Sequence, residues 1–258
     1  MEAGLRSYNR RMPEKIDRVL TDHAANQPFA PTETAVENLK REGFDRVYPA
    51  ADFPRRPLIA QVGDVMYDAA LFCAAKAEEK TGILDTLGLK AGKYVLATIH
   101  RAENVDQLER LIVIMEALNA VARQIPVVLP LHPRTRARLH ASRASRRFKP
   151  HTSLIVIDPV GYLEMTALEK NAAAIATDSG GVQKEAFFHE IPCVTLRSET
   201  EWIELVRLGW NALAPMDSSE AIAAQITAAI HCKPASREKP YGEGNSAARI
   251  LEILTKCC

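Results

Sequence analysis

The sequence predicts an α/β protein with parallel sheets, and two observations support this. Short apolar runs alternate with helical patterns through the second half of the chain, at the spacing of βαβ units. Polar residues also follow the ends of the predicted strands, the edge at which open α/β sheets bind ligands. These polar residues are His100, Arg101, His132, Ser179, Arg197 and Glu201.

The composition is that of a globular protein. The 258 residues suffice for one large or two ordinary domains. The content of 47% hydrophobic and 25% charged residues is typical of globular proteins. A net charge of +1 gives no reason to expect nucleic acid or a membrane surface as partner. No apolar run approaches the ~20 residues of a membrane span, and the first residues lack the pattern of a signal peptide.

Neither the cysteines nor the run of basic residues predicts a binding site. The five cysteines are odd in number and form no C-x-x-C pair, so neither a disulfide framework nor a metal site is predicted, and a cytoplasmic location is expected. The basic run at residues 134–149 contains no interleaved aromatic residues. We interpret it as a solvated helix face and loop.

The first third of the chain contains mainly helical patterns. Helices are predicted near residues 13–25, 34–41 and 65–80, with Thr32 as the N-cap of the second and Gly43 at its end. A strand end is predicted at residues 29–31, and 58–62 is a short apolar run.

The remainder of the chain alternates regularly between strands and helices. Strands are predicted at residues 94–99, 127–131, 154–157, 172–176 and 193–196. Helices are predicted at residues 106–123, 182–189, 217–231 and 246–256.

A glycine-rich turn at residues 177–185 is the strongest single indication of a ligand. It joins a buried strand to a helix through Ser179, Gly180 and Gly181, where uncovered N–H groups and the helix dipole favour an anion. A phosphate or diphosphate would suit this turn, and Glu185, one helical turn later, could accept hydrogen bonds from ribose hydroxyls. A tight turn without any ligand is the alternative.

Arginine and histidine at the other strand ends agree with a diphosphate. The guanidinium groups of Arg101 and Arg197 match phosphate oxygens with paired hydrogen bonds. His100 and His132 could donate to phosphate or carry protons, and each could instead simply cap a loop.

A dinucleotide cofactor is not expected. The one G-x-G-x-x-A match, at residues 242–247, follows no predicted strand, and a dinucleotide fingerprint requires a strand, a turn and a helix. We interpret it as the start of the last helix.

Several motifs together resemble the non-hydrolysing UDP-N-acetylglucosamine 2-epimerases over essentially the whole chain. In order, they are MEAGLRS at residues 1–7, MPE at 12–14, PTET at 31–34, HRAEN at 100–104, TDSGGVQKE at 177–185, RSETEW at 197–202 and YGEG at 241–244. The resemblance implies two Rossmann-like domains facing across a cleft, the GT-B-like architecture, with no cofactor. It further implies a cytoplasmic homodimer in polysaccharide biosynthesis that interconverts UDP-N-acetylglucosamine and UDP-N-acetylmannosamine.

The resemblance also implies a mechanism. A base removes the C2 proton, UDP leaves to give a glycal, and UDP adds back after protonation on the other face. Such chemistry needs carboxylates for proton transfer and a cationic cradle for the leaving UDP.

Site residues are carried over by motif. Glu2 and Glu14 would be the acid and base carboxylates, with His100 as the neighbouring catalytic or phosphate-contacting histidine. The motifs further imply that Ser179 and Gly180 bind the diphosphate and that Glu185 binds the ribose. They place His132 at the nucleotide and the turn from Gly161 to Met165 against uracil. The strand-end pattern adds Arg101 and Arg197 at the diphosphate.

Some positions depart from the family pattern. Lys15, Asp17 and Ala102 stand where the family often has an acidic residue, an asparagine and an arginine, and Met165 replaces an aromatic residue. The combination of residues 183–185 with 199–202 is closer to relatives acting on 2,3-diacetamido sugars. Reaction type is therefore better specified than substrate.

The resemblance predicts the domain organisation. Residues 1–90 would form a partial N-terminal domain with a linker helix, 91–238 the UDP-binding domain, and 239–258 a helix packing back on the first. The first domain is expected to be incomplete, because in the family about three βα units of ~30 residues precede the motif of Glu2. Nucleotide binding should then survive better than catalysis. Two alternatives stay open: a glycosyltransferase of the same fold, and a UDP-sugar-binding module without turnover.

Overall fold

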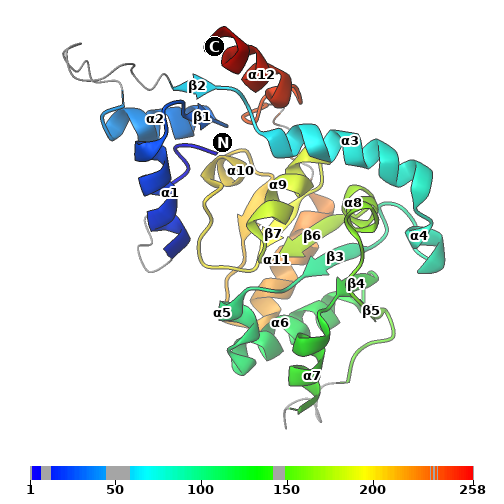
Figure 1. Cartoon of the computed structure of the whole chain (residues 1–258). Helices are drawn as coiled ribbons and strands as arrows, with labels where there is room; N and C mark the ends of the chain where they lie inside the picture. Colours follow the sequence, from blue (N-terminus) through cyan, green and yellow to red (C-terminus); the bar gives the residue numbers. More distant parts are fainter. Residues whose placement is uncertain are drawn as a thin grey trace. The chain divides into compact units, whose positions relative to one another are not determined.

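The computed structural model shows two compact units (Figure 1). It describes residues 2–6, 13–44, 59–141, 149–232, 234, 236 and 238–257, without the side chains of residues 13–15, 134, 138, 140, 141 and 257. Unit 1 comprises Met1–Leu71 and Arg237–Cys258, and unit 2 comprises Phe72–Ser236.

Unit 2 contains a six-stranded sheet in which every described pair of strands is parallel. The strands are β3 (Val95–Thr98), β4 (Val127–Pro130), β5 (Leu154–Ile157), β6 (Ala174–Thr177), β7 (Cys193–Thr195) and β8 (Asn211–Leu213). Their order across the sheet is β5-β4-β3-β6-β7-β8. The predicted α/β class with parallel sheets is confirmed.

The helices of unit 2 follow the strands along the chain. They are α4 (Ile83–Thr86), α5 (Ala102–Val105), α6 (Leu108–Val121), α7 (Pro133–Ala141), α8 (Tyr162–Lys170), α9 (Gly180–Phe188), α10 (Ile203–Arg207) and α11 (Ser219–His231). The helix α3 (Val65–Lys80) contributes to both units.

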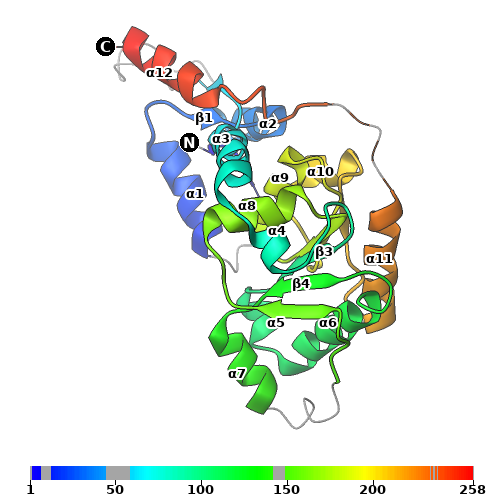
Figure 2. The ribbon, with the colours of Figure 1, turned by 90° about the vertical axis from the view of Figure 1, so that its right-hand side faces the viewer.

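Two apolar layers sandwich this sheet because successive strand residues point to opposite faces. Val95 and Ala97 of β3 pack with α6 and α11 on one face. Leu96, between them, packs with α8 and α9 on the other. Figure 2 shows these helix pairs on opposite sides of the sheet. Strands buried on both faces explain why their sequences are continuously apolar.

The strand order creates a switch point between β3 and β6. From β3 the chain proceeds through α6, on one face, to β4; from β6 it proceeds through α9, on the other face, to β7. The connections after β3 and β6 therefore diverge, and the space between them at the carboxyl edge of the sheet is where such folds bind ligands.

Unit 1 is smaller and contains a two-stranded parallel sheet. Its elements are α1 (Pro13–Ala24), β1 (Phe29–Ala30), α2 (Glu33–Arg41), β2 (Ala60–Gln61), the start of α3, and α12 (Ser246–Cys257). Thr32 caps α2 by accepting from the Ala35 N–H at 3.2 Å, as predicted. Asp68 of α3 accepts from the N–H groups of Ser246 and Ala247, at 3.0 and 2.8 Å, and so caps α12. The glycine motif at residues 242–247 is confirmed as the start of this helix.

The structure differs from the predicted elements in three ways. The helix predicted at 106–123 is α6, which begins two residues later, at Leu108, after the extended backbone of its N-cap Gln107. Helix α9 begins at Gly180, two residues before the predicted start. The elements α4, α5, α8, β8 and α10 were not predicted, and the turn expected from Gly161 to Met165 is the N-cap and first turn of α8. In the basic run, residues 142–148 lie outside the described residues. No described helix has the length and apolar character needed to cross a membrane.

Candidate functional site

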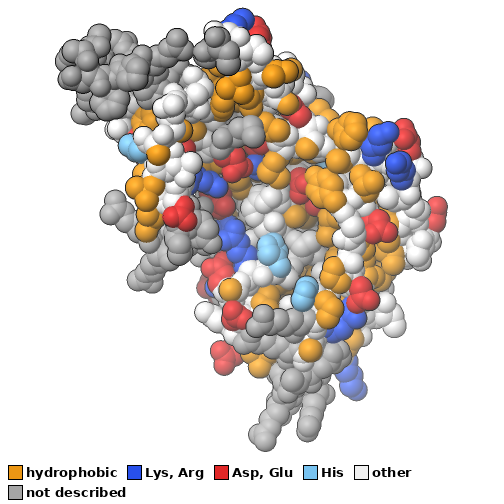
Figure 3. Space-filling view, viewed as in Figure 1, with side chains coloured by type: hydrophobic (Ala, Val, Ile, Leu, Met, Phe, Trp, Pro, Cys, Tyr) orange, Lys and Arg blue, Asp and Glu red, His pale blue; other side chains and the backbone are white. Residues whose placement is uncertain are grey.

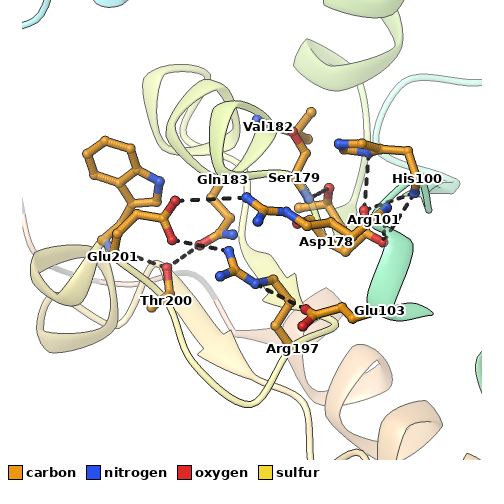
Figure 4. A network of polar contacts seen from close by, with 12 residues as sticks. His100, Arg101, Glu103, Asp178, Ser179, Val182, Gln183, Arg197, Thr200 and Glu201 are labelled. Carbon is orange, nitrogen blue, oxygen red and sulfur yellow. Dashed lines mark hydrogen bonds and ion pairs between the residues drawn. The ribbon is translucent and has the colours of Figure 1, made fainter. Parts of the chain in front are cut away.

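The candidate site is built where β3 and β6 end side by side. Thr98 and Thr177 are register partners, and their Oγ1 atoms are 2.6 Å apart in a buried hydrogen bond. The next residues along each chain segment, His100 with Arg101 and Asp178 with Ser179, therefore meet at the switch point (Figure 4).

Asp178 organises the backbone at this point, and sequence reasoning did not single it out. Its buried carboxylate accepts from the N–H groups of His100 and Arg101 at 3.0–3.1 Å and from Asn104 Nδ2 at 2.9 Å. Burial alone would raise the pKa of Asp178, but hydrogen bonds from His100 and Asn104 bring that pKa below its ordinary value. An ionised Asp178 thus fastens the loop after β3 to the glycine turn.

The glycine turn presents donors to an anion. The Ser179 hydroxyl caps α9 by accepting from the Val182 N–H at 3.4 Å, which leaves its own O–H free to donate. Among the described residues, the N–H groups of Gly180 and Gly181 have no acceptor. Two unpaired N–H groups and a hydroxyl at the start of a nine-residue helix form a site suited to phosphate.

The backbone at Gly180 lies close to the loop after β7, which the sequence does not reveal. A Cβ at this position would lie 2.9 Å from Glu201 Oε1 and 3.3 Å from Trp202 Nε1. A side chain here would therefore require the side chains of Glu201 and Trp202, in the loop after β7, to shift.

Two arginines converge on Glu201 beneath the turn (Figure 4). Glu201 Oε2 lies 3.1 Å from Arg197 Nη1, and Glu201 Oε1 lies 4.0 Å from Arg101 Nη2. Arg101 also donates from Nε to the Asp178 carbonyl at 3.2 Å. Arg197 is buried and has a second, longer ion pair of 3.6 Å with the exposed Glu103.

Glu185 has a partner that sequence reasoning missed. Its Oε1 accepts a 2.7 Å hydrogen bond from the hydroxyl of Tyr162, at the start of α8. Burial and this hydrogen bond raise the pKa of Tyr162, so the phenol stays a donor at neutral pH. Tyr162 orients the carboxylate that was predicted to bind ribose.

Glu169 is a second carboxyl group near Glu185 and was also missed. It is 1% exposed, and its Oε1 has no hydrogen-bond partner among the described residues. Burial, with the charge of Glu185 as a smaller cause, raises the pKa of Glu169 well above its ordinary value. Nothing in the sequence around Glu169 indicated that its carboxyl group is buried.

The predicted nucleoside contacts follow β4 and β5. His132 lies two residues after the end of β4 and is exposed, as is His100. Figure 3 shows histidine side chains (pale blue) on this face of unit 2. Gly161 is the N-cap of α8 and donates from its N–H to Glu164 Oε2 at 2.9 Å. Met165 is half-buried and packs against the core.

In unit 1, Glu2 has an unusual backbone. Its φ of 63° is in the left-handed region, which costs a residue with a side chain about 1 kcal/mol, and such strain clusters at functional sites. Its Oε2 lies 3.4 Å from Arg18 Nη2. The side chain of Glu14 lies outside the described residues, although its backbone begins α1. No three described His, Cys, Asp or Glu side chains converge as metal ligands would.

Comparisons with known proteins agree on one family. The sequence pattern of the family described as UDP-N-acetylglucosamine 2-epimerase matches residues 1–255. A UDP-N-acetylglucosamine 2-epimerase homolog of Methanococcus maripaludis is 48% identical over 98% of this chain and 67% of its own length. The UDP-2,3-diacetamido-2,3-dideoxy-D-glucuronate 2-epimerase of Pseudomonas aeruginosa is 45% identical over 99% of this chain and 67% of its own.

A solved structure gives the same result. The UDP-GlcNAc 2-epimerase of Methanocaldococcus jannaschii, crystallised with UDP-GlcNAc and UDP, is 40% identical with a TM-score of 0.82. The match covers 99% of this chain and 68% of that one. The chain thus spans about two thirds of the length of the relatives it matches.

Proposed function

The chain belongs to the UDP-N-acetylglucosamine 2-epimerase family, and on that premise we propose that it epimerises a UDP-linked N-acetylated amino sugar at C2. The family and the relatives named above are nucleotide-sugar 2-epimerases, which are isomerases.

One observation carries the proposal for this chain. The unpaired N–H groups of Gly180 and Gly181, the Ser179 hydroxyl and His100 meet at the switch point between β3 and β6. These donors suit the two phosphates of UDP, which is both part of the substrate and the leaving group. Donors positioned before the reaction stabilise the negative charge that UDP gains as its bond to C1 breaks.

The proton chemistry is assigned to carboxylates. We propose that Glu2 and Glu14 serve as base and acid at C2, and that His100 contacts the phosphate or the proton path. The side chain of Asp178 supports the role of His100, since its Oδ1 lies 3.2 Å from His100 Nδ1. An aspartate in this position favours a proton on Nδ1 and leaves Nε2 to face a ligand.

The nucleoside is assigned to residues from α8, α9 and the end of β4. Glu185, oriented by Tyr162, would accept from the ribose hydroxyls. The turn from Gly161 to Met165 would contact uracil, with His132 beside it. Arg101 and Arg197 would supply positive charge to the diphosphate.

Two sugars compete as the substrate. UDP-N-acetylglucosamine is the substrate in the names of most relatives, including one from Methanocaldococcus jannaschii at 40% identity. The relative named for UDP-2,3-diacetamido-2,3-dideoxy-D-glucuronate is 45% identical. This identity lies between that 40% and the 48% of the UDP-N-acetylglucosamine 2-epimerase homolog, which makes the diacetamido glucuronate the second candidate.

Proton NMR in deuterated water tests the proposal. Each UDP-sugar is incubated with the purified chain, and the C2 proton is followed. We expect the C2 signal to disappear with one of the two sugars while the signals of its C2 epimer appear. The C2 signal could instead persist with both sugars while the signals of their UDP group broaden, which shows that they are bound. That result would contradict epimerisation and favour a binding module or a glycosyltransferase.

We further propose, from the same resemblance, a cytoplasmic homodimer. Light scattering during gel filtration should then give a mass of twice the 28.5 kDa chain. A mass of one chain at micromolar concentration would contradict it.

A further inference from the structure

Glu201 differs in burial and in partners from Glu103 and Asp178, the other acidic residues near the glycine turn. Its side chain is only 9% exposed, and its two carboxylate oxygens face two different arginines, Arg197 at 3.1 Å and Arg101 at 4.0 Å. Glu103 is about half exposed and reaches Arg197 alone, at 3.6 Å. Asp178 mainly accepts from backbone N–H groups.

The position of Glu201 connects three strand-end loops. Arg101 follows β3, Gly180 follows β6, and Arg197 with Glu201 follows β7. Glu201 Oε1 contacts the place where a Cβ of Gly180 would be, so the carboxylate lies directly against the turn. A buried carboxylate that bridges two guanidinium groups fixes their orientation, because each long side chain would otherwise have several rotamers.

We propose that Glu201 is a positioning residue for diphosphate binding: it holds Arg101 and Arg197 in the orientation in which their charge reaches a diphosphate at the glycine turn. The inference rests on the proposed function of this edge. The expected effect is opposite to that of charge alone, because removing a negative charge near an anion site removes Coulomb repulsion and should strengthen binding of the anion.

The opposite signs make the proposal testable with Glu201→Gln. We expect this variant of the 258-residue chain to bind UDP at least about tenfold more weakly, since a charge-assisted contact that aligns both arginines is lost. Uridine, which lacks the diphosphate, should bind within about twofold of its wild-type affinity. Isothermal titration with both ligands gives the comparison.

Glu103→Gln is the matched control. It removes the same charge from the same arginine, but at an exposed position that does not bridge two side chains. Its UDP affinity should stay within about twofold of wild type or become slightly tighter. Equal weakening of UDP binding by both variants would overturn the proposal, because bulk charge would then explain the effect.

Other outcomes are equally decisive. Unchanged or tighter UDP binding by Glu201→Gln would show that Glu201 competes with the diphosphate or has no role. If that variant does not fold, Glu201→Asp replaces it, since a shorter carboxylate keeps the charge but cannot reach both arginines. Clearly weaker UDP binding by Glu201→Asp would support the proposal. Wild-type affinity of Glu201→Asp for UDP would overturn it. Absence of UDP binding by the wild-type chain is a different result and would contradict the proposed function itself.

Discussion

Glu169 is a buried carboxyl group that lowers the stability of unit 2. Its Oε1 lacks a partner among the described residues, and the burial that raises its pKa favours the protonated form. The acidic groups whose charges interact with it are Glu185, Tyr94, Tyr162 and Cys193. No described cation compensates it in these contacts.

The pH dependence of stability follows from the direction of this shift. In the unfolded chain Glu169 ionises from its ordinary value near 4.5 upward, whereas in the folded protein it stays protonated to a higher pH. Stability is therefore lost as pH rises from about 4.5 toward the folded pKa.

Glu169→Leu should remove this loss. We expect the variant to be more stable than wild type by about 1–3 kcal/mol at pH 7.5 and by less at pH 4.5. Urea unfolding followed by tryptophan fluorescence measures this in unit 2, which contains both tryptophans, Trp202 and Trp210. Glu169→Gln is the control: it should abolish the pH dependence with a smaller gain. An unchanged pH dependence in both variants would refute the assignment.

Glu2 is the residue on which the proposed proton chemistry depends most directly. Glu2→Gln keeps the size of the side chain but cannot accept a proton. We expect exchange of the substrate C2 proton with solvent to slow by at least about a hundredfold, the usual contribution of general base catalysis. UDP affinity should be retained. The same variant with wild-type exchange would exclude Glu2 as the base.

At the scale of elements, much of the fold could be predicted from the sequence. The apolar runs of β3 to β7 predicted buried strands, which the structure has, and α3 and β5 lie at the predicted residues. β8 could not be predicted, because it is three residues long and leads from a short helix. Helix α5 was not predicted, and its Asn104 donates from Nδ2 to Asp178 and the Leu196 carbonyl, both too distant in sequence for a local pattern to indicate.

The glycine turn illustrates what a sequence leaves undetermined at this scale. The order Ser-Gly-Gly after a strand predicts uncovered N–H groups, and the structure has them. It does not predict that Glu201 and Trp202 press against Gly180, since their approach depends on packing of the loop after β7. The same applies to the contact of Tyr162 with Glu185.

Gly180→Ala tests the close approach. The added Cβ would meet Glu201 Oε1 and Trp202 Nε1, so both side chains would have to shift, and Glu201 is also the partner of Arg197. We expect a loss of about 1–3 kcal/mol in the free energy of unfolding and weaker UDP binding. Gly82→Ala, at an exposed position with no atom within 4 Å of the new Cβ, should change stability by less than about 0.5 kcal/mol. If Gly180→Ala and Gly82→Ala were equally stable, the close approach of Glu201 and Trp202 to Gly180 would be contradicted.

At the scale of the whole molecule, the strand order decides where the site lies. The sequence predicts strands and the polar residues that follow them, but not that β3 and β6 are neighbours, because their pairing joins residues almost 80 positions apart, such as Thr98 and Thr177. Only that neighbourhood brings His100 to Ser179. We therefore propose the carboxyl edge of unit 2 as the diphosphate site.

Hydrogen–deuterium exchange measured by mass spectrometry with and without UDP tests that claim most directly. The unpaired N–H groups of Gly180 and Gly181 should acquire an acceptor, so peptides covering residues 98–104 and 178–183 should exchange more slowly when UDP is bound. UDP binding that leaves both segments unprotected, with slower exchange only elsewhere in the chain, would contradict the account.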